Sequence, residues 1–203
     1  MKTPEKSKLT EEVKISKNSS INPSTTRDLE KAVQILRSGG LVIFPTDTVY
    51  GIGCKAGDDI AIAKLKRIKG SLQKFPILIS SMAQAYSLAK ISPQVLKLAS
   101  QFWPGALTII LWDKSAKEKI GLRMPDSNLI RLIIEKLNSP IIGTSANFHG
   151  QKPPKTFKEI DKRLIKKVDF ILKGRCKLGV ESTVIDATFS PPRIIRRGAI
   201  QLQ

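Results

Sequence analysis

The sequence is short of cysteine, histidine and acidic residues, and each shortage narrows what the chain can be. Its 203 residues include 2 cysteines, 1 histidine and 17 acidic side chains. Cys54 and Cys176 stand far apart, which fits neither a disulfide framework nor the paired spacing of zinc ligands. A lone histidine, His149, disfavours a histidine-based metal centre. We therefore expect reduced thiols and no metal site built from protein ligands.

Long hydrophobic runs are also missing. None approaches the roughly 20 residues that span a bilayer, and the polar residues 1–14 lack the apolar centre of a secretory signal. The hydrophobic content of 41% is nevertheless ordinary for a chain that folds around one core. We expect a soluble, cytoplasmic protein without a membrane partner.

Basic residues are abundant and spread along the whole chain. The 35 lysines and arginines against 17 acids give a formal net charge of +18. One interpretation is a polyanionic partner, such as tRNA, another RNA or the phosphates of a nucleotide. The other is that lysines only solvate helix surfaces, and charge by itself does not choose between the two.

Helical and extended patterns alternate after a polar beginning. We predict a flexible extension over residues 1–22 and one domain over 23–203. Apolar spacing over 29–36 predicts a helix with capping candidates at 24–26 and Gly39-Gly40 as its stop. Further helices are predicted at 58–69, 82–89, 93–102, 127–137 and 156–167. Extended runs are expected at 41–45, 76–80, 106–112, 120–124, 140–144, 168–172, 183–187 and 193–196. This alternation predicts an α/β fold with helices layered on a mixed sheet.

The segment 41–57, LVIFPTDTVYGIGCKAG, is the most informative stretch. An apolar strand ends at Pro45 and is followed by a stretch that we interpret as a glycine-rich loop, which carries Thr46, Asp47, Thr48 and Tyr50. Its glycines match a dinucleotide-binding spacing, but they do not follow the strand directly, and no acid caps the next strand. A dinucleotide site is therefore rejected.

Two further segments, GTSAN at 143–147 and ESTVID at 181–186, place polar side chains at strand ends. GTSAN lacks the second glycine of a serine-hydrolase elbow, so Ser145 is better interpreted as a hydrogen-bonding group than as a nucleophile. A cap or turn role is about as compatible with the spacing. Three such clusters, with Lys69, Arg123 and Arg196 beside extended segments, predict a cleft that holds phosphates and a carboxylate.

These motifs together resemble the YrdC-like threonylcarbamoyl-AMP synthase family, single-domain type. The resemblance runs from 29 to 199 and rests on PTDTVYG, Lys69, IGLRMPD, SAN, GVESTVID and IIRRGAI. It implies a twisted mixed sheet with flanking helices around a basic cavity. It also implies a nucleotidyltransferase that makes threonylcarbamoyl-AMP and pyrophosphate from L-threonine, bicarbonate and ATP. The product would then be used by a tRNA threonylcarbamoyl transferase to form threonylcarbamoyladenosine next to the anticodon.

The resemblance also implies roles for single residues. Lys69 and Arg123 would be catalytic, and four residues would surround threonine: Thr48, Arg123, Ser145 and Ser182. ATP would contact Lys69, Asn147, Thr156 and Arg196. Mg²⁺ is expected on the ATP phosphates, held mainly by phosphate oxygens and water, with no metal ligands from the protein.

The chain departs from the family pattern at several of its positions. Ser71 stands where the family has an arginine two residues after its lysine, and Phe75, Ser80 and Lys119 also replace other types. Arg67 or Lys74 would be the nearest substitutes for the missing charge. The alternative function is therefore a non-catalytic, RNA-binding member of the same fold.

Overall fold

A computed structural model describes residues 23–202, so the extension expected over 1–22 lies outside the described residues. The helices are α1 (Pro23–Arg37), α2 (Asp59–Lys69), α3 (Met82–Leu88), α4 (Pro93–Phe102), α5 (Asn128–Leu137), the short 3₁₀ helix η1 (Phe157–Glu159) and α6 (Lys162–Ile165). The strands are β1 (Val42–Pro45), β2 (Tyr50–Lys55), β3 (Ile77–Leu78), β4 (Leu107–Trp112), β5 (Lys119–Arg123), β6 (Ile141–Ser145), β7 (Phe170–Ile171), β8 (Thr183–Asp186) and β9 (Arg193–Arg196).

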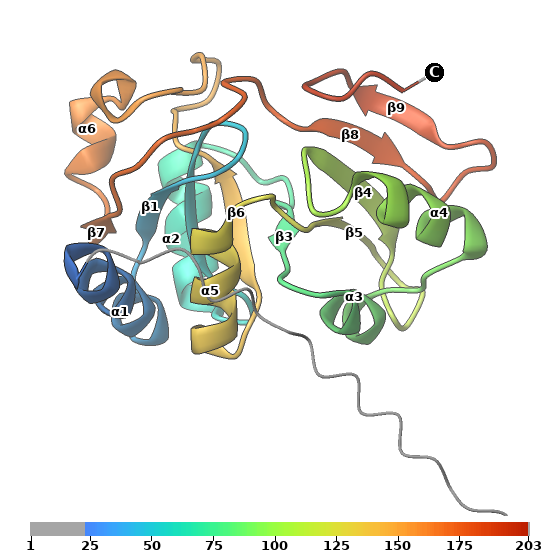
Figure 1. Ribbon diagram of the computed structural model, residues 1–203, viewed down its shortest axis with the longest axis horizontal. Helices are drawn as coiled ribbons and strands as arrows, with labels where there is room; N and C mark the ends of the chain where they lie inside the picture. Colours follow the sequence, from blue (N-terminus) through green and yellow to red (C-terminus); the bar gives the residue numbers. More distant parts are fainter. Residues whose placement is uncertain (1–22, 203) are drawn as a thin grey trace, which may run out of the picture.

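One mixed sheet runs through the described part of the chain (Figure 1). Its strand order is β7-β1-β2-β6-β3-β5-β4-β8-β9. Parallel pairs (β1 with β7, β3 with β5, β4 with β8) are interspersed with antiparallel ones. The predicted α/β class with a mixed sheet is confirmed. No helix among residues 23–202 is long and apolar enough to cross a membrane.

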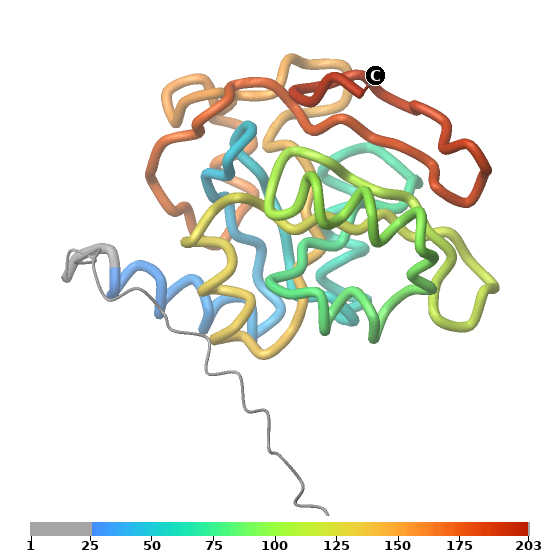
Figure 2. Tube along the Cα trace, turned by 45° about the vertical axis from the view of Figure 1, so that its right-hand side comes forward, coloured from blue at the N-terminus to red at the C-terminus, as the bar shows by residue number. Residues whose placement is uncertain are grey.

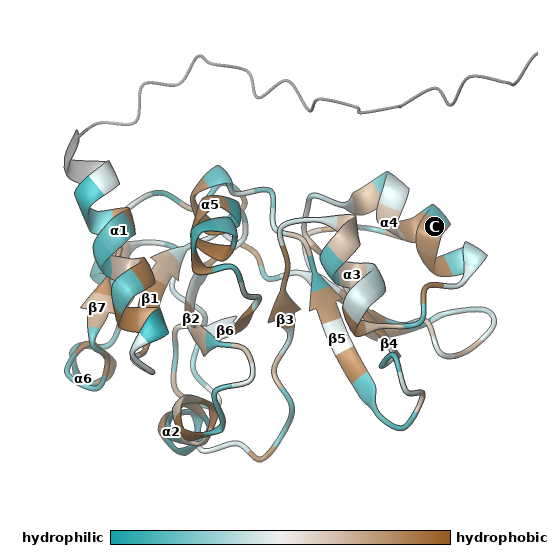
Figure 3. Ribbon diagram, turned by 90° about the horizontal axis from the view of Figure 1, so that it is seen from below, coloured by the Kyte–Doolittle hydropathy of each residue, from teal (hydrophilic) through white to brown (hydrophobic). Residues whose placement is uncertain are grey.

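Strand β1 is buried on both faces, which explains why its sequence is a continuous apolar run. Val42 and Phe44 belong to the core under α1 and α5, whereas Leu41 and Ile43 face the core under α2. Figure 3 shows α1 and α5 on one side of β1, β2 and β6, with α2 on the other. The strand is therefore held from both sides, and its end at Pro45 is fixed in place.

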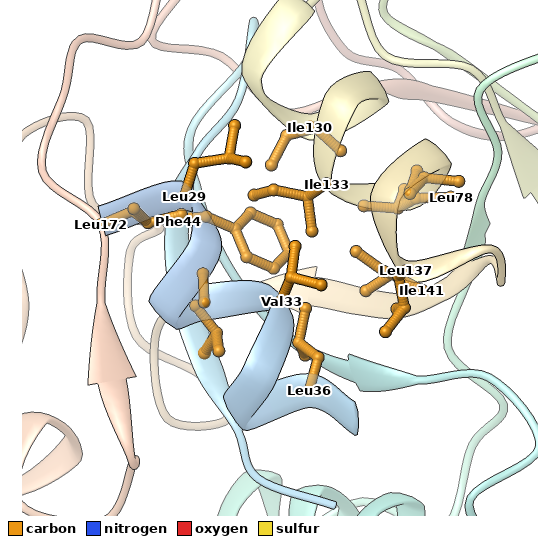
Figure 4. Close-up of a cluster of buried hydrophobic side chains, with 13 residues drawn as sticks. Leu29, Val33, Leu36, Phe44, Leu78, Ile130, Ile133, Leu137, Ile141 and Leu172 are labelled. Carbon is orange, nitrogen blue, oxygen red and sulfur yellow. The ribbon is translucent and has the colours of Figure 1, made fainter. Parts of the chain in front are cut away.

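The core under α1 and α5 shows how the predicted helical spacing is used (Figure 4). It joins side chains one turn apart on each helix to side chains from the strands, namely Leu29, Val33, Leu36, Ile130, Ile133, Leu137, Phe44, Leu78, Ile141 and Leu172. A second core lies under α3 and α4 and contains Leu107, Ile109 and Leu111 of β4. Because strand side chains alternate, Thr108 points to the opposite face of β4.

Two sequence expectations are wrong. The stretch expected as a glycine-rich loop is strand β2, which pairs with β1 and β6. Its glycines serve close packing: a Cβ on Gly51 would lie 2.8 Å from the Phe44 ring. The helix expected over 156–167 is divided into η1 and α6. Ile160 lies between them with extended backbone and a buried side chain, so packing into the core interrupts the helix.

Candidate active site

A cavity of about 110 Å³ opens among the ends of the central strands. It is lined by Phe44, Thr46, Thr48, Val49, Tyr50, Gly51, Pro76, Leu78, Thr108, Arg123, Gly143, Thr144, Ser145, Glu181, Ser182 and Arg196. The lining combines six threonine and serine hydroxyl groups with charged groups and a small apolar wall. Its volume admits several water molecules or one small polar ligand.

The turn between β1 and β2 positions the first hydroxyl group. Thr46 Oγ1 donates to the carbonyl of Val49 at 2.7 Å and accepts from the backbone N–H of Thr48 at 3.1 Å. The Thr46 and Thr48 hydroxyl oxygens also lie 2.8 Å apart. Both side chains are buried. Thr48 therefore reaches the cavity from a turn whose conformation is fixed by its own hydrogen bonds.

Arg123 of β5 is held by three groups. Its Nε donates to the carbonyl of Gly105 at 3.0 Å, Nη1 donates to Thr48 Oγ1 at 3.0 Å, and Nη2 donates to Asp47 Oδ1 at 2.5 Å. Arg123 is 6% exposed and Asp47 3%. Burial lowers the pKa of Arg123, and the charge of Asp47 opposes that shift. The guanidinium is thus a rigid donor at the cavity wall.

Ser182, Thr108 and Arg196 form a second group of donors. The hydroxyl oxygens of Ser182 and Thr108 lie 2.9 Å apart, and both residues are buried. Arg196 of β9 donates to the carbonyl of Ser182 from Nη2 at 2.9 Å and to Glu181 Oε1 from Nη1 at 2.9 Å. Two cations, Arg123 and Arg196, therefore line one small cavity, and Arg196 lowers the pKa of Arg123.

Lys69, at the end of α2, lies behind the Ser145–Asn147 segment. Its ammonium donates to the Ser145 carbonyl at 2.8 Å, to Asn147 Oδ1 at 3.1 Å and to the Asn147 carbonyl. An ammonium has three protons, so these acceptors use all of them. In this conformation Lys69 contributes charge and holds the segment that carries Ser145 and Asn147.

Burial lowers the pKa of Lys69 from 10.5 to about 8, and the nearby charge of Glu181 partly offsets the shift. Because the unfolded chain binds this proton more tightly, the free energy of unfolding should rise between pH 8 and about 10.5. We expect a rise on the order of 1–3 kcal/mol that Lys69→Met removes. Urea unfolding across this range measures it. Lys66→Met, one turn earlier on α2, should keep the rise, and an equal loss in both variants would refute the assignment.

The predicted site residues do not all meet. Thr48, Arg123, Ser145, Ser182 and Arg196 line the cavity. Lys69 and Asn147 adjoin it through Ser145. Thr156 is not among the lining residues; its side chain is exposed, and its hydroxyl donates to Glu159 Oε1 at 3.1 Å.

Sequence reasoning assigned no role to three residues at the site: Asp47, Thr108 and Glu181. Asp47 lies within the PTDTVYG motif, but nothing in the sequence indicates that its partner is Arg123. Thr108 is the polar residue within the apolar stretch LTIILW, and this is the signal that could have revealed it. Glu181 begins the ESTVID segment, in which the polar pattern predicted a role only for the hydroxyl groups that follow it.

Of the residues that depart from the family pattern, Ser71 follows α2 and Lys119 begins β5. Ser71 accepts a hydrogen bond from the backbone N–H of Gln73 at 3.2 Å. Lys74 pairs with Glu118 at 2.6 Å on the surface, and Lys119 pairs with Asp186 at 2.9 Å. Neither substitute cation, Arg67 or Lys74, lines the cavity.

The chain segment 172–182 carries Glu181 and Ser182 to the cavity. It runs from β7 at one edge of the sheet to β8 near the other, and Figure 2 shows it crossing the molecule. Tyr50 Oη donates to the Gly174 carbonyl at 2.7 Å and accepts from the Gly174 N–H at 2.9 Å. The backbone N–H groups of Leu178 and Gly179 donate to the carbonyls of Asp47 and Thr48. The β1–β2 turn therefore anchors this segment.

Fold and site together define an α/β protein with a cationic, hydroxyl-lined ligand pocket at the ends of its strands. The chain belongs to the Sua5/YciO/YrdC family, whose model, described as telomere recombination, matches residues 34–198. The resemblance noted from the motifs is thereby confirmed.

Three relatives show how far the similarity extends. A Pyrococcus abyssi threonylcarbamoyl-AMP synthase is 35% identical over 184 residues, which cover 85% of this chain and 54% of the relative. The chain thus spans about half the length of that protein. Its structure, named Sua5 and complexed with L-threonine, gives a TM-score of 0.76 at 35% identity over 84% of this chain and 54% of that one.

The other two relatives match along most of their own length. A Methanocaldococcus jannaschii protein provisionally named threonylcarbamoyl-AMP synthase is 36% identical over 86% of this chain and 87% of the relative. The crystal structure of Escherichia coli YciO gives a TM-score of 0.79 at 29% identity, covering 89% of this chain and 93% of that one. The chain therefore covers most of the length of both proteins.

Proposed function

We propose that this protein is an L-threonylcarbamoyladenylate synthase, a nucleotidyltransferase that uses L-threonine, bicarbonate and ATP. The observation that carries the proposal is the convergence of Thr48, Ser145 and Ser182 with Arg123 on one small cavity. The similarity to the P. abyssi protein, whose structure is a complex with L-threonine, supports the same ligand here. Residues 23–203 would act as a single catalytic domain.

The cavity suits recognition of threonine. Three of the five N–H groups of Arg123 are directed to Gly105, Thr48 and Asp47, which leaves one on each terminal nitrogen for a substrate carboxylate. The hydroxyl groups of Ser145 and Ser182 are neutral donors and acceptors for the remaining polar atoms. Phe44, Pro76 and Leu78 supply an apolar wall for a methyl group.

The chemistry requires no nucleophile from the protein. The threonine amine reacts with bicarbonate to give a carbamate and water, a carbamate oxygen attacks the α-phosphorus of ATP, and pyrophosphate leaves. The protein would contribute by positioning the reactants and by placing positive charge near the phosphates. Lys69 and Arg196 are the cations nearest to this role, with Asn147 beside Lys69. Thr156 would reach ATP only outside the cavity.

A divalent cation fits this arrangement as a companion of ATP. Within residues 23–202 no three His, Cys, Asp or Glu side chains gather as metal ligands. Mg²⁺ would therefore be held by phosphate oxygens and water and would neutralise phosphate charge. Further partners belong to the same proposal: a tRNA threonylcarbamoyl transferase that receives the product, contact with tRNA through the basic surface, and a cytoplasmic location.

Pyrophosphate release tests the function directly. The purified protein, given ATP, bicarbonate and Mg²⁺, should release pyrophosphate only when L-threonine is present, and mass spectrometry should detect threonylcarbamoyl-AMP. Release without threonine, or no release, would contradict the proposal. Salt-dependent binding of RNA without any pyrophosphate would instead support the non-catalytic alternative.

A further inference from the structure

A single carboxylate lines the cavity. Among the described lining residues only Glu181 is acidic; Asp47 is not one of them and pairs with Arg123. Glu181 Oε1 accepts a hydrogen bond from Arg196 Nη1 at 2.9 Å. A carboxylate offers about four acceptor sites on its two oxygens. The bond from Arg196 uses one of these sites, so the Glu181 carboxylate can still accept hydrogen bonds from a ligand in the cavity.

The charge of Glu181 also acts within the site. It raises the pKa of Lys69 against the larger effect of burial, so the carboxylate and the ammonium interact. Arg123 enters the cavity from β5, whereas Glu181 enters from the segment just before β8. The cavity thus presents a fixed guanidinium and a carboxylate from separate chain segments. A zwitterionic ligand carries a carboxylate and an ammonium group, so its site needs one cationic and one anionic side chain.

We propose that Glu181 binds the α-ammonium group of the substrate and thereby makes the cavity selective for α-amino acids. This inference rests on the proposed function and assigns a binding partner to the ammonium group of the substrate, whose carboxylate is assigned to Arg123. Moving an ammonium group from water into the cavity is costly unless an anion or several acceptors replace its hydration. The other polar side chains of the lining are hydroxyl groups and cations, so Glu181 is the group that matches the ammonium charge.

A competing role for Glu181 is to hold Arg196 in place. The two roles are separated by comparing L-threonine with 3-hydroxybutyrate, which keeps the carboxylate, hydroxyl and methyl groups but has hydrogen in place of the amine. If Glu181 binds the amine, its loss weakens only the first ligand. If it acts through Arg196, its loss weakens both ligands alike.

The experiment is an NMR titration of each ligand into wild-type protein and Glu181→Gln, with a non-hydrolysable ATP analogue present. We expect Glu181→Gln to weaken L-threonine binding by about 10- to 100-fold, as for a lost charge-assisted hydrogen bond. Binding of 3-hydroxybutyrate should change by less than about twofold. Glu135→Gln, which removes the same charge from an exposed position on α5, should change neither. Equal weakening of both ligands, or unchanged threonine binding, would overturn the inference.

Three further outcomes also bear on the inference. If Glu181→Gln does not fold, as far-UV circular dichroism would reveal, Glu181→Asp keeps the charge on a shorter stem. Persistent preference for L-threonine over 3-hydroxybutyrate in that variant supports the inference, and loss of the preference opposes it. If wild-type protein binds neither ligand, the proposed function fails. Wild-type threonine-dependent release of pyrophosphate with an unaltered Glu181→Gln profile would contradict the role of Glu181 alone.

Discussion

Arg123→Ala is expected to abolish threonine-dependent pyrophosphate release and to lower the free energy of unfolding by about 3–5 kcal/mol. The stability loss follows because the substitution leaves the carboxylate of Asp47 buried, 3% exposed, without its cation. The activity loss follows because the proposed partner of the substrate carboxylate is gone. Chemical denaturation and a pyrophosphate assay measure the two effects separately.

A double variant separates catalysis from folding. Asp47→Asn with Arg123→Met removes both charges, so no uncompensated ion remains in the interior. Its loss in the free energy of unfolding should be well below the sum of the losses in the two single variants, as a double-mutant cycle shows for neighbours in contact. Threonine use should nevertheless stay lost. Recovery of activity together with stability would show that Arg123 serves only to hold Asp47 and the β1–β2 turn.

Gly53→Ala is expected to be the most destabilising small substitution in the sheet, by on the order of 3 kcal/mol. A Cβ at Gly53 would overlap the carbonyl oxygen of Ile142 on β6, which is backbone and cannot rotate away. The melting temperature should fall by about 6–12 °C for a domain of this size. Scanning calorimetry measures the shift.

A second glycine of the same sheet provides the control. An added Cβ at Gly121 would meet Thr108 Cγ2 at 3.6 Å, which is an ordinary van der Waals contact. Gly121→Ala should therefore leave the melting temperature within about 2 °C. If both variants melt alike, the close approach of β2 and β6 at Gly53 is not what requires glycine there.

These glycines also show where sequence patterns stop being informative. Glycine is depleted in strands, so Gly51 and Gly53 in one short segment favour a loop. What makes them strand residues is the Phe44 ring and the backbone of β6 lying against them. Both are tertiary contacts, and the phenylalanine comes from the preceding strand. Local propensity could not contain that information.

The candidate site could be predicted where a polar side chain stands directly at the end of an extended run. Thr48, Ser145 and Ser182 each follow or begin an extended run, and polar groups at strand ends commonly build binding sites. Their convergence on one cavity agrees with the sequence prediction. The pairing of Asp47 with Arg123 was not predictable, because no local period links residues that far apart. Thr156 was placed with ATP by resemblance alone, and it is not among the residues that line the cavity.

The long segment 172–182 brings residues from the end of the sequence to a cavity that also uses residues from its beginning. Thr48 belongs to the first hairpin, whereas Glu181 and Ser182 arrive only after the chain has crossed the whole sheet. A chain without its final strands would contain the hydroxyl group of Thr48 but not the carboxylate of Glu181. A ligand bound in the cavity would contact residues from both parts of the sequence and would therefore stabilise the folded state in which they meet.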